Sequence, residues 1–360
     1  MQAIVQDRFG SPDVLRVDTV PVPTPGKGEV LVRVIASSAN PRDWHYLRGV
    51  PYIARPTMGL REPKFRLPGS DIAGIVESAG TQTTRLGHGD EVIAYVQSGG
   101  FSELTAVPEA ILGRKPSNLT FEEAATVPLA GTAALQGLRF GGVRAGQRLL
   151  IVGASGGLGT FAIQIAKAWG VHVTGVCSTQ NVDLVRSLGA DEVIDYKRED
   201  FTAGAPRFDV VFQLGGTASA SRIRRVLKRD GVLVLNSGDG GGRWFGPFGR
   251  IIGAKFVDVI ASQKIGTFEA KANAEDLEIL RTLIEAGQVR PVIDRTFALS
   301  ETPEAIRLVE TGHVQGKLAI SVQPLTHQPS DEKSVSLPDG ASPVEPRSRM
   351  LAPNDEESGT

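Results

Sequence analysis

The stretch VGASGGLG at residues 152–159 contains the glycines with the clearest chemical use. Ala154, Gly156 and Gly159 follow a G-x-G-x-x-G pattern with alanine in the first position. The pattern lies after an apolar, strand-like run and before a helical one, which is the context of a dinucleotide-binding turn. Gly156 would let the backbone approach a diphosphate, Gly159 would let the helix pack close to the strand, and the helix N-terminus would offer N–H groups to phosphates. The alternative is a strand-to-helix turn without a ligand. The expected nucleotide contacts are Ala154, Ser155, Gly156, Gly157, Leu158 and Gly159.

The choice between NAD and NADP depends on the end of the second strand, where an NAD site usually places an acid on the ribose 2′-hydroxyl. Here that strand ends in GVCSTQN, and the first acid is Asp183, inside the next predicted helix. Ser178 and Thr179 can donate hydrogen bonds to a 2′-phosphate without repelling it, although Gln180 stands where a cation is expected. The missing carboxylate favours NADP(H).

The composition is that of a globular protein. The chain has 360 residues, of which 41% are hydrophobic and 22% are charged, and this length favours two domains. The net charge of −1 gives no reason to expect nucleic acid or an anionic membrane surface as a partner. A single cysteine, Cys177, excludes an intrachain disulfide framework and a Cys-rich zinc site. We find no signal-peptide pattern and no bilayer-length apolar run, so we expect a cytoplasmic enzyme.

Two kinds of periodicity divide the chain. Before Phe121, short β-rich runs bounded by glycine and proline predict a compact, barrel-like β region. After it, strands alternate with helices, which predicts βαβ units and a parallel sheet. One of the expected helices covers residues 219–230. A glycine- and aromatic-rich stretch over 238–256 predicts a mobile loop, and residues 324–360 have the composition of a disordered tail.

Several motifs in order resemble those of the medium-chain dehydrogenase/reductase superfamily, and within it the zinc-independent quinone oxidoreductase (zeta-crystallin) branch. The motifs are NPRDWHYLRG, LPGSDIAGIVESAG, GDEV, GGFSEL, AATVPLAGTAAL, VGASGGLG, LGADEVIDY and GKLAI. The resemblance implies an α/β protein with a GroES-like β-rich catalytic domain and a Rossmann doubly wound parallel sheet. It places the catalytic domain at 1–124, completed by 260–323, and the Rossmann NADP-binding domain at 125–259, with the active site in the cleft between them.

The zinc enzymes of this superfamily use a Cys three residues before an Asp, a G-H-E motif and a four-Cys lobe. In this chain Asn40 stands three residues before Asp43, Ser70 stands at the His position, and the four-Cys lobe is absent. Amide and hydroxyl oxygens hold zinc poorly, so we expect no metal. Without a Lewis acid, alcohol oxidation loses its main support. What remains is hydride donation from NADPH to an electrophilic acceptor, namely a quinone, an enone or an activated alkene.

The resemblance also suggests catalytic residues. Asn40 would lie near the nicotinamide and donate from its amide to a developing oxyanion, or it would only cap the turn before Pro41. Tyr52, His45 and Tyr46 are candidates for proton delivery or for stacking over the acceptor, and the alternative for each is an aromatic side chain that lines the loop. Water can supply the proton, so a dedicated acid is not required.

Further cofactor contacts follow from the same resemblance. Thr132 would contact the nicotinamide carboxamide or cap its helix, Tyr196 would flank the 2′-phosphate or end its strand, and Lys317 would lie near the cofactor cleft or be a solvated surface lysine. Gln213 stands where relatives often carry an acid at a strand end near the cofactor. The aromatic residues of the glycine-rich loop would line the acceptor pocket or make subunit contacts; they are Trp244, Phe245 and Phe248.

Two other functions compete with the reductase. One is a zinc-type, NAD(P)-dependent alcohol dehydrogenase, which Asn40 and Ser70 disfavour. The other is a catalytically idle, NADP-binding adaptor whose C-terminal tail binds a partner. Relatives usually form dimers or tetramers through the edge of the Rossmann sheet, so we expect a homodimer, with residues 256–264 as a candidate pairing strand.

Overall fold

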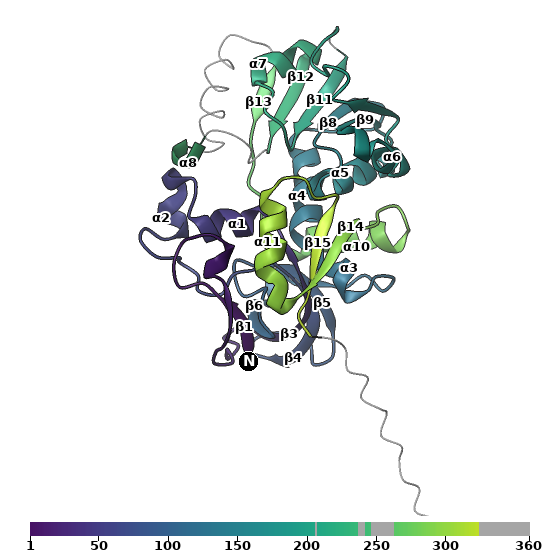
Figure 1. Ribbon diagram of the computed structural model, residues 1–360. Coiled ribbons are helices and arrows are strands. Elements are labelled where there is room, and N and C mark those ends of the chain that lie inside the picture. The colour runs from purple at the N-terminus through teal and green to yellow at the C-terminus, as the bar shows by residue number, and fades with distance from the viewer. Residues whose placement is uncertain (206, 237–241, 246–262, 324–360) are drawn as a thin grey trace, which may run out of the picture. The chain divides into compact units, whose positions relative to one another are not determined.

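The structure of the chain is a computed structural model with an α/β architecture, which confirms the predicted class (Figure 1). The described residues are 1–205, 207–236, 242–245 and 263–323. The predicted tail and Phe248 lie outside them, as do all but the last two residues of the candidate pairing strand. The described residues all belong to one compact unit.

A seven-stranded, mostly antiparallel sheet contains the β-rich part of the chain. Its strands, in order, are β14 (Ile293–Ala298), β15 (Lys317–Ser321), β3 (Glu29–Ala39), β4 (Asp71–Ala79), β5 (Glu91–Tyr95) and β7 (Gly113–Arg114), and β6 (Leu104–Pro108) also pairs with β3. A separate ribbon joins β1 (Gln2–Val5) to β2 (Arg16–Thr19). In the antiparallel register of β15 and β3, Ala319 lies opposite Ser38. The last described strand therefore completes a sheet that begins near the N-terminus.

A six-stranded parallel sheet follows in the middle of the chain. Its strands, in order, are β10 (Glu192–Asp195), β9 (His172–Cys177), β8 (Arg148–Val152), β11 (Phe208–Gln213), β12 (Leu227–Leu235) and β13 (Lys264–Gly266). The strand order reverses between β8 and β11, and ligands of such sheets bind at the carboxyl ends of the strands beside that point. β13 belongs to this sheet. The domain boundaries suggested by the resemblance stay predictions.

The helices are amphipathic or buried where the sequence is periodic. They are α1 (Pro41–Arg48), α2 (Arg55–Met58), α3 (Phe121–Ala125), α4 (Pro128–Phe140), α5 (Gly157–Ala168), α6 (Val182–Ser187), α7 (Ala220–Ile223), α8 (Gly242–Phe245), α10 (Ala274–Glu285) and α11 (Thr302–Glu310).

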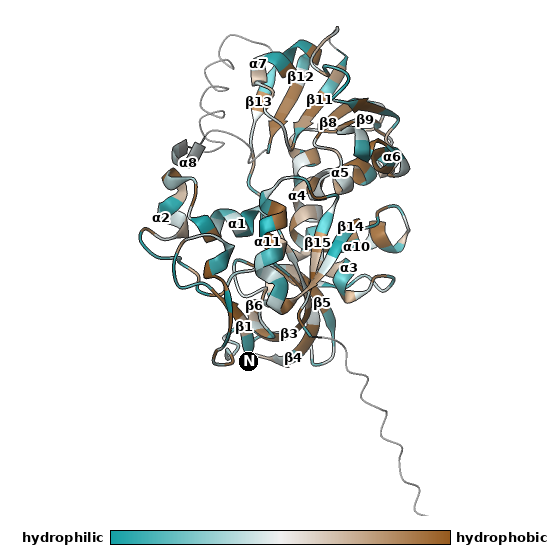
Figure 2. Cartoon of the chain, viewed as in Figure 1, coloured by the Kyte–Doolittle hydropathy of each residue, from teal (hydrophilic) through white to brown (hydrophobic). Residues whose placement is uncertain are grey.

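One core cluster runs from Ile35 and Ala73 of the antiparallel sheet through α3 and α4 to Phe161 and Phe212. In Figure 2 the central strand β11 and much of β12 are brown, as expected for strand segments buried on both faces. None of the described helices is long and apolar enough to cross a membrane.

The helix expected over 219–230 is wrong in its second half. The structure has α7, a short 3-10 turn over Arg224–Val226, and then β12, which starts at Leu227. Leu227 is fully buried and pairs with Phe208 of β11, so pairing with the neighbouring strand prevails over the local helical pattern.

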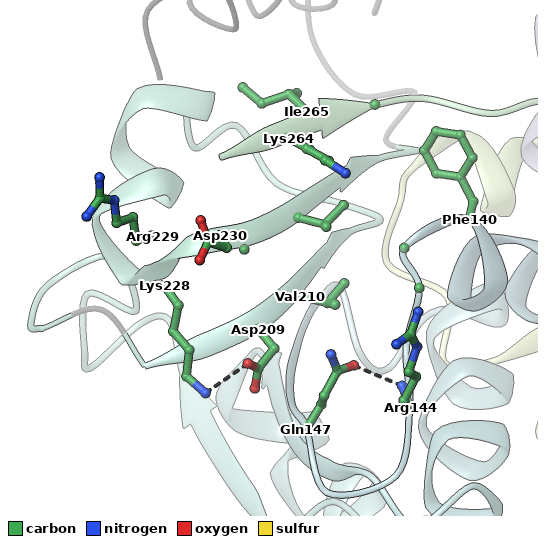
Figure 3. A pocket seen from close by; sticks show the side chains of 15 residues that line it. Phe140, Arg144, Gln147, Asp209, Val210, Lys228, Arg229, Asp230, Lys264 and Ile265 are labelled. Atoms are coloured by element: carbon green, nitrogen blue, oxygen red, sulfur yellow. Dashed lines mark hydrogen bonds and ion pairs between the residues drawn. The ribbon is translucent and has the colours of Figure 1, made fainter. Parts of the chain in front are cut away.

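A cavity of about 860 Å³ opens at the amino ends of β11, β12 and β13 (Figure 3). Phe140 of α4, Asp209, Lys228 and Lys264 are among the side chains that line it. Lys228 donates to Asp209 across 2.8 Å at its rim. Because this cavity lies at the opposite end of the strands from the glycine turn, it is not the expected nucleotide site.

Candidate active site

The glycine turn has the geometry that its sequence predicts. It follows β8, and Gly156 is the N-cap of the 12-residue helix α5. Gly153 has a φ of +88°, a conformation that favours glycine. A Cβ at Gly159 would lie 2.3 Å from the carbonyl oxygen of Gly153, so close packing of helix and strand requires glycine there. At Gly156 the nearest atom to an added Cβ is 3.6 Å away, so packing does not explain that glycine. Ala154 and Ser155 are mostly buried in the turn, and Gly157 and Leu158 begin the helix.

A hydrogen-bond chain joins this turn to the segment before β15. The Asn181 amide donates to Ser155 Oγ across 2.8 Å and accepts from the Gln315 amide across 2.7 Å. The Gly316 N–H also donates to the Ser155 carbonyl across 2.8 Å. Sequence reasoning missed Asn181 and Gln315, because 134 residues separate them and neither belongs to a motif.

The edge of the sheet where the ribose of the nucleotide is predicted to bind contains an acid that the sequence did not reveal. Thr179 Oγ1 donates to Asp195 Oδ2 across 2.7 Å, and this hydrogen bond is the largest cause of a lowered Asp195 pKa. Asp195 ends β10, the neighbour of β9, so a carboxylate does face the edge from the adjacent strand. Ser178 is mostly buried, while Gln180 and Tyr196 are exposed.

Asn40 lies at the centre of a buried group of polar side chains. Its amide nitrogen donates to Asp71 Oδ2 across 2.9 Å and to the Ser38 carbonyl across 3.2 Å. Its amide oxygen accepts from the Lys317 ammonium. We call Ser38, Asn40, Asp71 and Lys317 the amide cluster. The backbone N–H of Asn40 also donates to Asp43 Oδ2 across 2.8 Å, so Asn40 is indeed the N-cap residue of α1.

Asp71 is the fully buried acceptor of the amide cluster. Besides Asn40, it accepts from Ser38 Oγ across 2.6 Å and from the Leu129 N–H, at the start of α4, across 2.8 Å. The Lys317 ammonium lies 3.6 Å from its carboxylate. Asp71 follows Ser70 in the GSD motif, which gave the only available signal, and sequence reasoning assigned it no role.

Lys317 is buried, with 4% of its surface exposed, so the alternative of a solvated surface lysine is wrong. Its stem passes the first residue of α5, since a Cβ at Gly157 would lie 2.7 Å from Lys317 Cδ. Burial lowers the pKa of Lys317, while the carboxylates of Asp71 and Asp43 oppose that shift.

Asp43 and Ser70 form a second buried pair. Ser70 Oγ donates to Asp43 Oδ1 and accepts from the Arg42 guanidinium across 3.0 Å. Burial raises the pKa of Asp43 to about 6. Both residues that stand at zinc-ligand positions in the resemblance, Asn40 and Ser70, are thus engaged in hydrogen bonds. Among the described residues no cluster of three or more His, Cys, Asp or Glu side chains has metal-binding geometry.

The aromatic candidates lie in different surroundings. His45 Nδ1 is 3.1 Å from the Val50 carbonyl, and the Tyr46 ring lies 4.1 Å from the Arg42 guanidinium carbon. Tyr52 packs edge-on against Trp244 of α8, with ring centroids 5.3 Å apart. The structure thus joins Tyr52 to the glycine-rich loop.

Thr132 is buried inside α4, whose N-cap is Val127, so the alternative that Thr132 caps the helix is wrong. Gln213 ends β11 beside the reversal of strand order. Its amide nitrogen donates to the Ala218 carbonyl across 3.1 Å, while its buried amide oxygen has no hydrogen-bond partner among the described residues.

Comparisons with known proteins agree with the fold. Residues 26–129 match the family model of an alcohol dehydrogenase GroES-like domain, and residues 188–320 match that of a zinc-binding dehydrogenase. The chain is 33% identical over 334 residues to 2-methylene-furan-3-one reductase of Solanum lycopersicum, covering 89% of this chain and 79% of the relative. The same figures apply to NADPH-dependent alkenal/one oxidoreductase, chloroplastic, of Arabidopsis thaliana. The solved quinone oxidoreductase from Coxiella burnetii is similar at a TM-score of 0.78 and 32% identity, over 90% of this chain and 99% of that one.

Proposed function

This chain belongs to the medium-chain dehydrogenase/reductase superfamily, in its quinone oxidoreductase branch, and from that premise we propose that it is a zinc-independent reductase. It passes hydride from NADPH to a quinone or an α,β-unsaturated carbonyl. One observation carries the proposal, namely the meeting of the glycine turn and the amide cluster at Lys317. The stem of Lys317 passes Gly157, and its ammonium contacts Asn40.

The residues of the glycine turn fit a dinucleotide. The N-terminus of α5 presents its first N–H groups and the positive end of its dipole at the carboxyl edge of β8. Space beside Gly156 and the unpartnered amide oxygen of Gln213 lie at the same edge of the sheet. When bound, the nicotinamide supplies the hydride. The chain binds the diphosphate at 154–159, orients the ring beside Thr132 and Asn40, and keeps water from the buried amide cluster.

NADPH is the proposed donor because one cation, Arg198, flanks the edge of the sheet where the ribose is expected to bind. Arg198 Nε lies 3.4 Å from Asp195 Oδ2, which itself accepts from Thr179 Oγ1. The Arg198 side chain is 78% exposed, so it can turn to a 2′-phosphate, and it supplies the cation that is missing at Gln180. The name of the Arabidopsis relative, which is NADPH-dependent, supports the same choice. Ser178, Thr179 and Tyr196 complete the proposed subsite.

Zinc independence is proposed from the chemistry of the donor atoms. An amide and a hydroxyl are poor zinc ligands, and both already exchange hydrogen bonds with protein groups. The acceptor therefore has to be electrophilic on its own. Tyr52 and Trp244 are proposed to flank its flat body, with His45 and Tyr46 as further candidates on α1, and water supplies the proton.

The direct test is oxidation of NADPH by the purified chain. We expect 1,4-naphthoquinone or a simple acyclic enone to be reduced. We expect EDTA or 1,10-phenanthroline to leave the rate unchanged. Alcohol-dependent reduction of NAD(P) that a chelator abolishes would replace the proposal with the zinc-type alcohol dehydrogenase. Tight NADPH binding without turnover of quinones, enones or aldehydes would replace it with the idle adaptor.

We also propose that the chain forms a homodimer and acts in the cytoplasm. A homodimer would be measured by light scattering of the purified chain, and a monomer at micromolar concentration would contradict it. A cytoplasmic location would be measured by cell fractionation, and recovery in an organelle fraction would contradict it.

A further inference from the structure

The charges around Asn40 determine which way its amide group faces. The two ends of an asparagine amide have nearly the same shape, so hydrogen-bond partners decide between two orientations related by a flip. An ammonium only donates and a carboxylate only accepts. The atom that faces Lys317 must therefore be the amide oxygen, and the atom that faces Asp71 must be the amide nitrogen, as the structure shows.

Both partners are held by their own surroundings. Asp71 is fully buried and is fixed by hydrogen bonds from Ser38 Oγ and the Leu129 N–H at 2.6 and 2.8 Å. Lys317 is buried on β15, and its ammonium also lies 3.4 Å from the Ala39 carbonyl. Either charge alone still favours the same amide orientation, so both charges must be removed before both orientations find partners.

The route of the Lys317 side chain links this arrangement to the glycine turn. Its stem crosses α5 at Gly157, where a side chain of any other residue would displace it. Its charge, however, lies in the amide cluster and not against the first turn of the helix. The geometry therefore separates the place where Lys317 touches the nucleotide site from the place where its charge acts.

We propose that Lys317 and Asp71 are positioning residues that fix the Asn40 amide in one orientation for hydride transfer. The proposal rests on the proposed function only for its effect on catalysis. The orientation itself is a property of the folded chain. Lys317 thus acts by orienting Asn40 and not by direct contact with the phosphates of the nucleotide.

The orientation is tested by NMR on protein labelled with ¹⁵N at asparagine side chains. The variant is the double variant K317M/D71N, because removing Lys317 alone would leave a buried carboxylate without its cation. Lys167→Met is the matched control, because Lys167 makes a 2.8 Å ion pair with Asp191 away from the amide cluster. We expect exchange of the Asn40 amide protons to be at least about tenfold faster in K317M/D71N and unchanged in K167M. Equal exchange rates in wild type and K317M/D71N would overturn the proposal.

Kinetics test the consequence. In K317M/D71N we expect kcat for quinone reduction to decrease about 100-fold while the Kd for NADPH, measured by calorimetry, changes less than about threefold. Lys317→Arg, which keeps the charge, should recover part of kcat. A weaker NADPH affinity with an unchanged kcat would show a phosphate ligand and overturn the proposal. If the wild-type chain reduces no acceptor, the proposed function fails, and the NMR experiment still decides whether Lys317 and Asp71 position Asn40.

Discussion

At the scale of single residues, the chemistry of the site depends on which polar atoms already have hydrogen-bond partners in the protein. The sequence predicted that the Asn40 amide donates to the acceptor, but both of its hydrogen atoms have protein acceptors in the structure, Asp71 and Ser38. A substrate oxyanion would have to replace the longer of these bonds, the 3.2 Å contact with the Ser38 carbonyl. Its role as a direct donor stays a prediction.

Asp43 should make stability depend on pH. Its folded pKa of about 6 is above the ordinary value of 3.8, so the folded chain keeps a proton that the unfolded chain loses. This stabilisation is complete below the unfolded pKa and is lost as pH rises through about 6, for a total of about 3 kcal/mol. Urea denaturation at pH 4 to 8 should show this loss in wild type and not in Asp43→Asn. The same pH dependence in both proteins would contradict the assignment.

Two glycines of the turn should respond differently to alanine. Gly156→Ala should fold with an unchanged Tm, because its Cβ meets nothing closer than 3.6 Å, and should bind NADPH at least about tenfold more weakly if a diphosphate lies there. Gly159→Ala should lower Tm, because its Cβ would lie 2.3 Å from a backbone oxygen. Thermal unfolding and calorimetry separate the two effects. Normal NADPH affinity in Gly156→Ala would mean that the turn is structural.

At the scale of elements, local patterns predicted the parts of the site that lie within one βαβ unit. The glycine turn between β8 and α5 follows from spacing over a few residues. The contacts of Lys317 with Asn40 could not be predicted in this way, because 277 residues separate the two side chains. Resemblance placed both near the cofactor, but only the pairing of β15 with β3 brings them together.

The turns after β9 and β10 should together determine the choice of nucleotide. Arg198→Met should raise the KM for NADPH about tenfold and leave the KM for NADH within about twofold, because only NADPH has the 2′-phosphate. Arg207→Met is a matched control, since Arg207 also makes a 3.4 Å ion pair, but with Glu192 at the amino end of the sheet. If Arg198→Met affects both nucleotides equally, Arg198 does not bind the 2′-phosphate.

At the scale of the whole molecule, the segment 315–317 joins the two sheets. Gly316 forms a β-bridge with Gly156 of the glycine turn, and the next residue begins β15 of the antiparallel sheet. A ligand at the turn therefore contacts a segment that is continuous with the strand beside the amide cluster. Binding energy gained at the nucleotide site can in this way stabilise the catalytic sheet.

Asn181 is the residue whose loss should weaken that connection. Asn181→Ala removes both the 2.8 Å bond to Ser155 and the 2.7 Å bond from Gln315, and leaves the Gly316 to Ser155 backbone bond in place. Two neutral hydrogen bonds contribute about 1–3 kcal/mol together, so hydrogen exchange of the Gly316 and Lys317 amides should become at least about fivefold faster.

Nucleotide binding should separate the wild type from this variant. In wild type, saturating NADPH should slow amide exchange in β8 and in β15, because the two strands are joined through Asn181 and Gly316. In Asn181→Ala the slowing should persist in β8 and decrease in β15. Asn118→Ala, which removes a single 2.9 Å bond to the Ile284 carbonyl, is the control that should leave both strands as in wild type. If Asn181→Ala and wild type show the same protection of β15 with NADPH, the hydrogen-bond chain does not transmit nucleotide binding between the sheets, and the backbone bridge at Gly316 is sufficient.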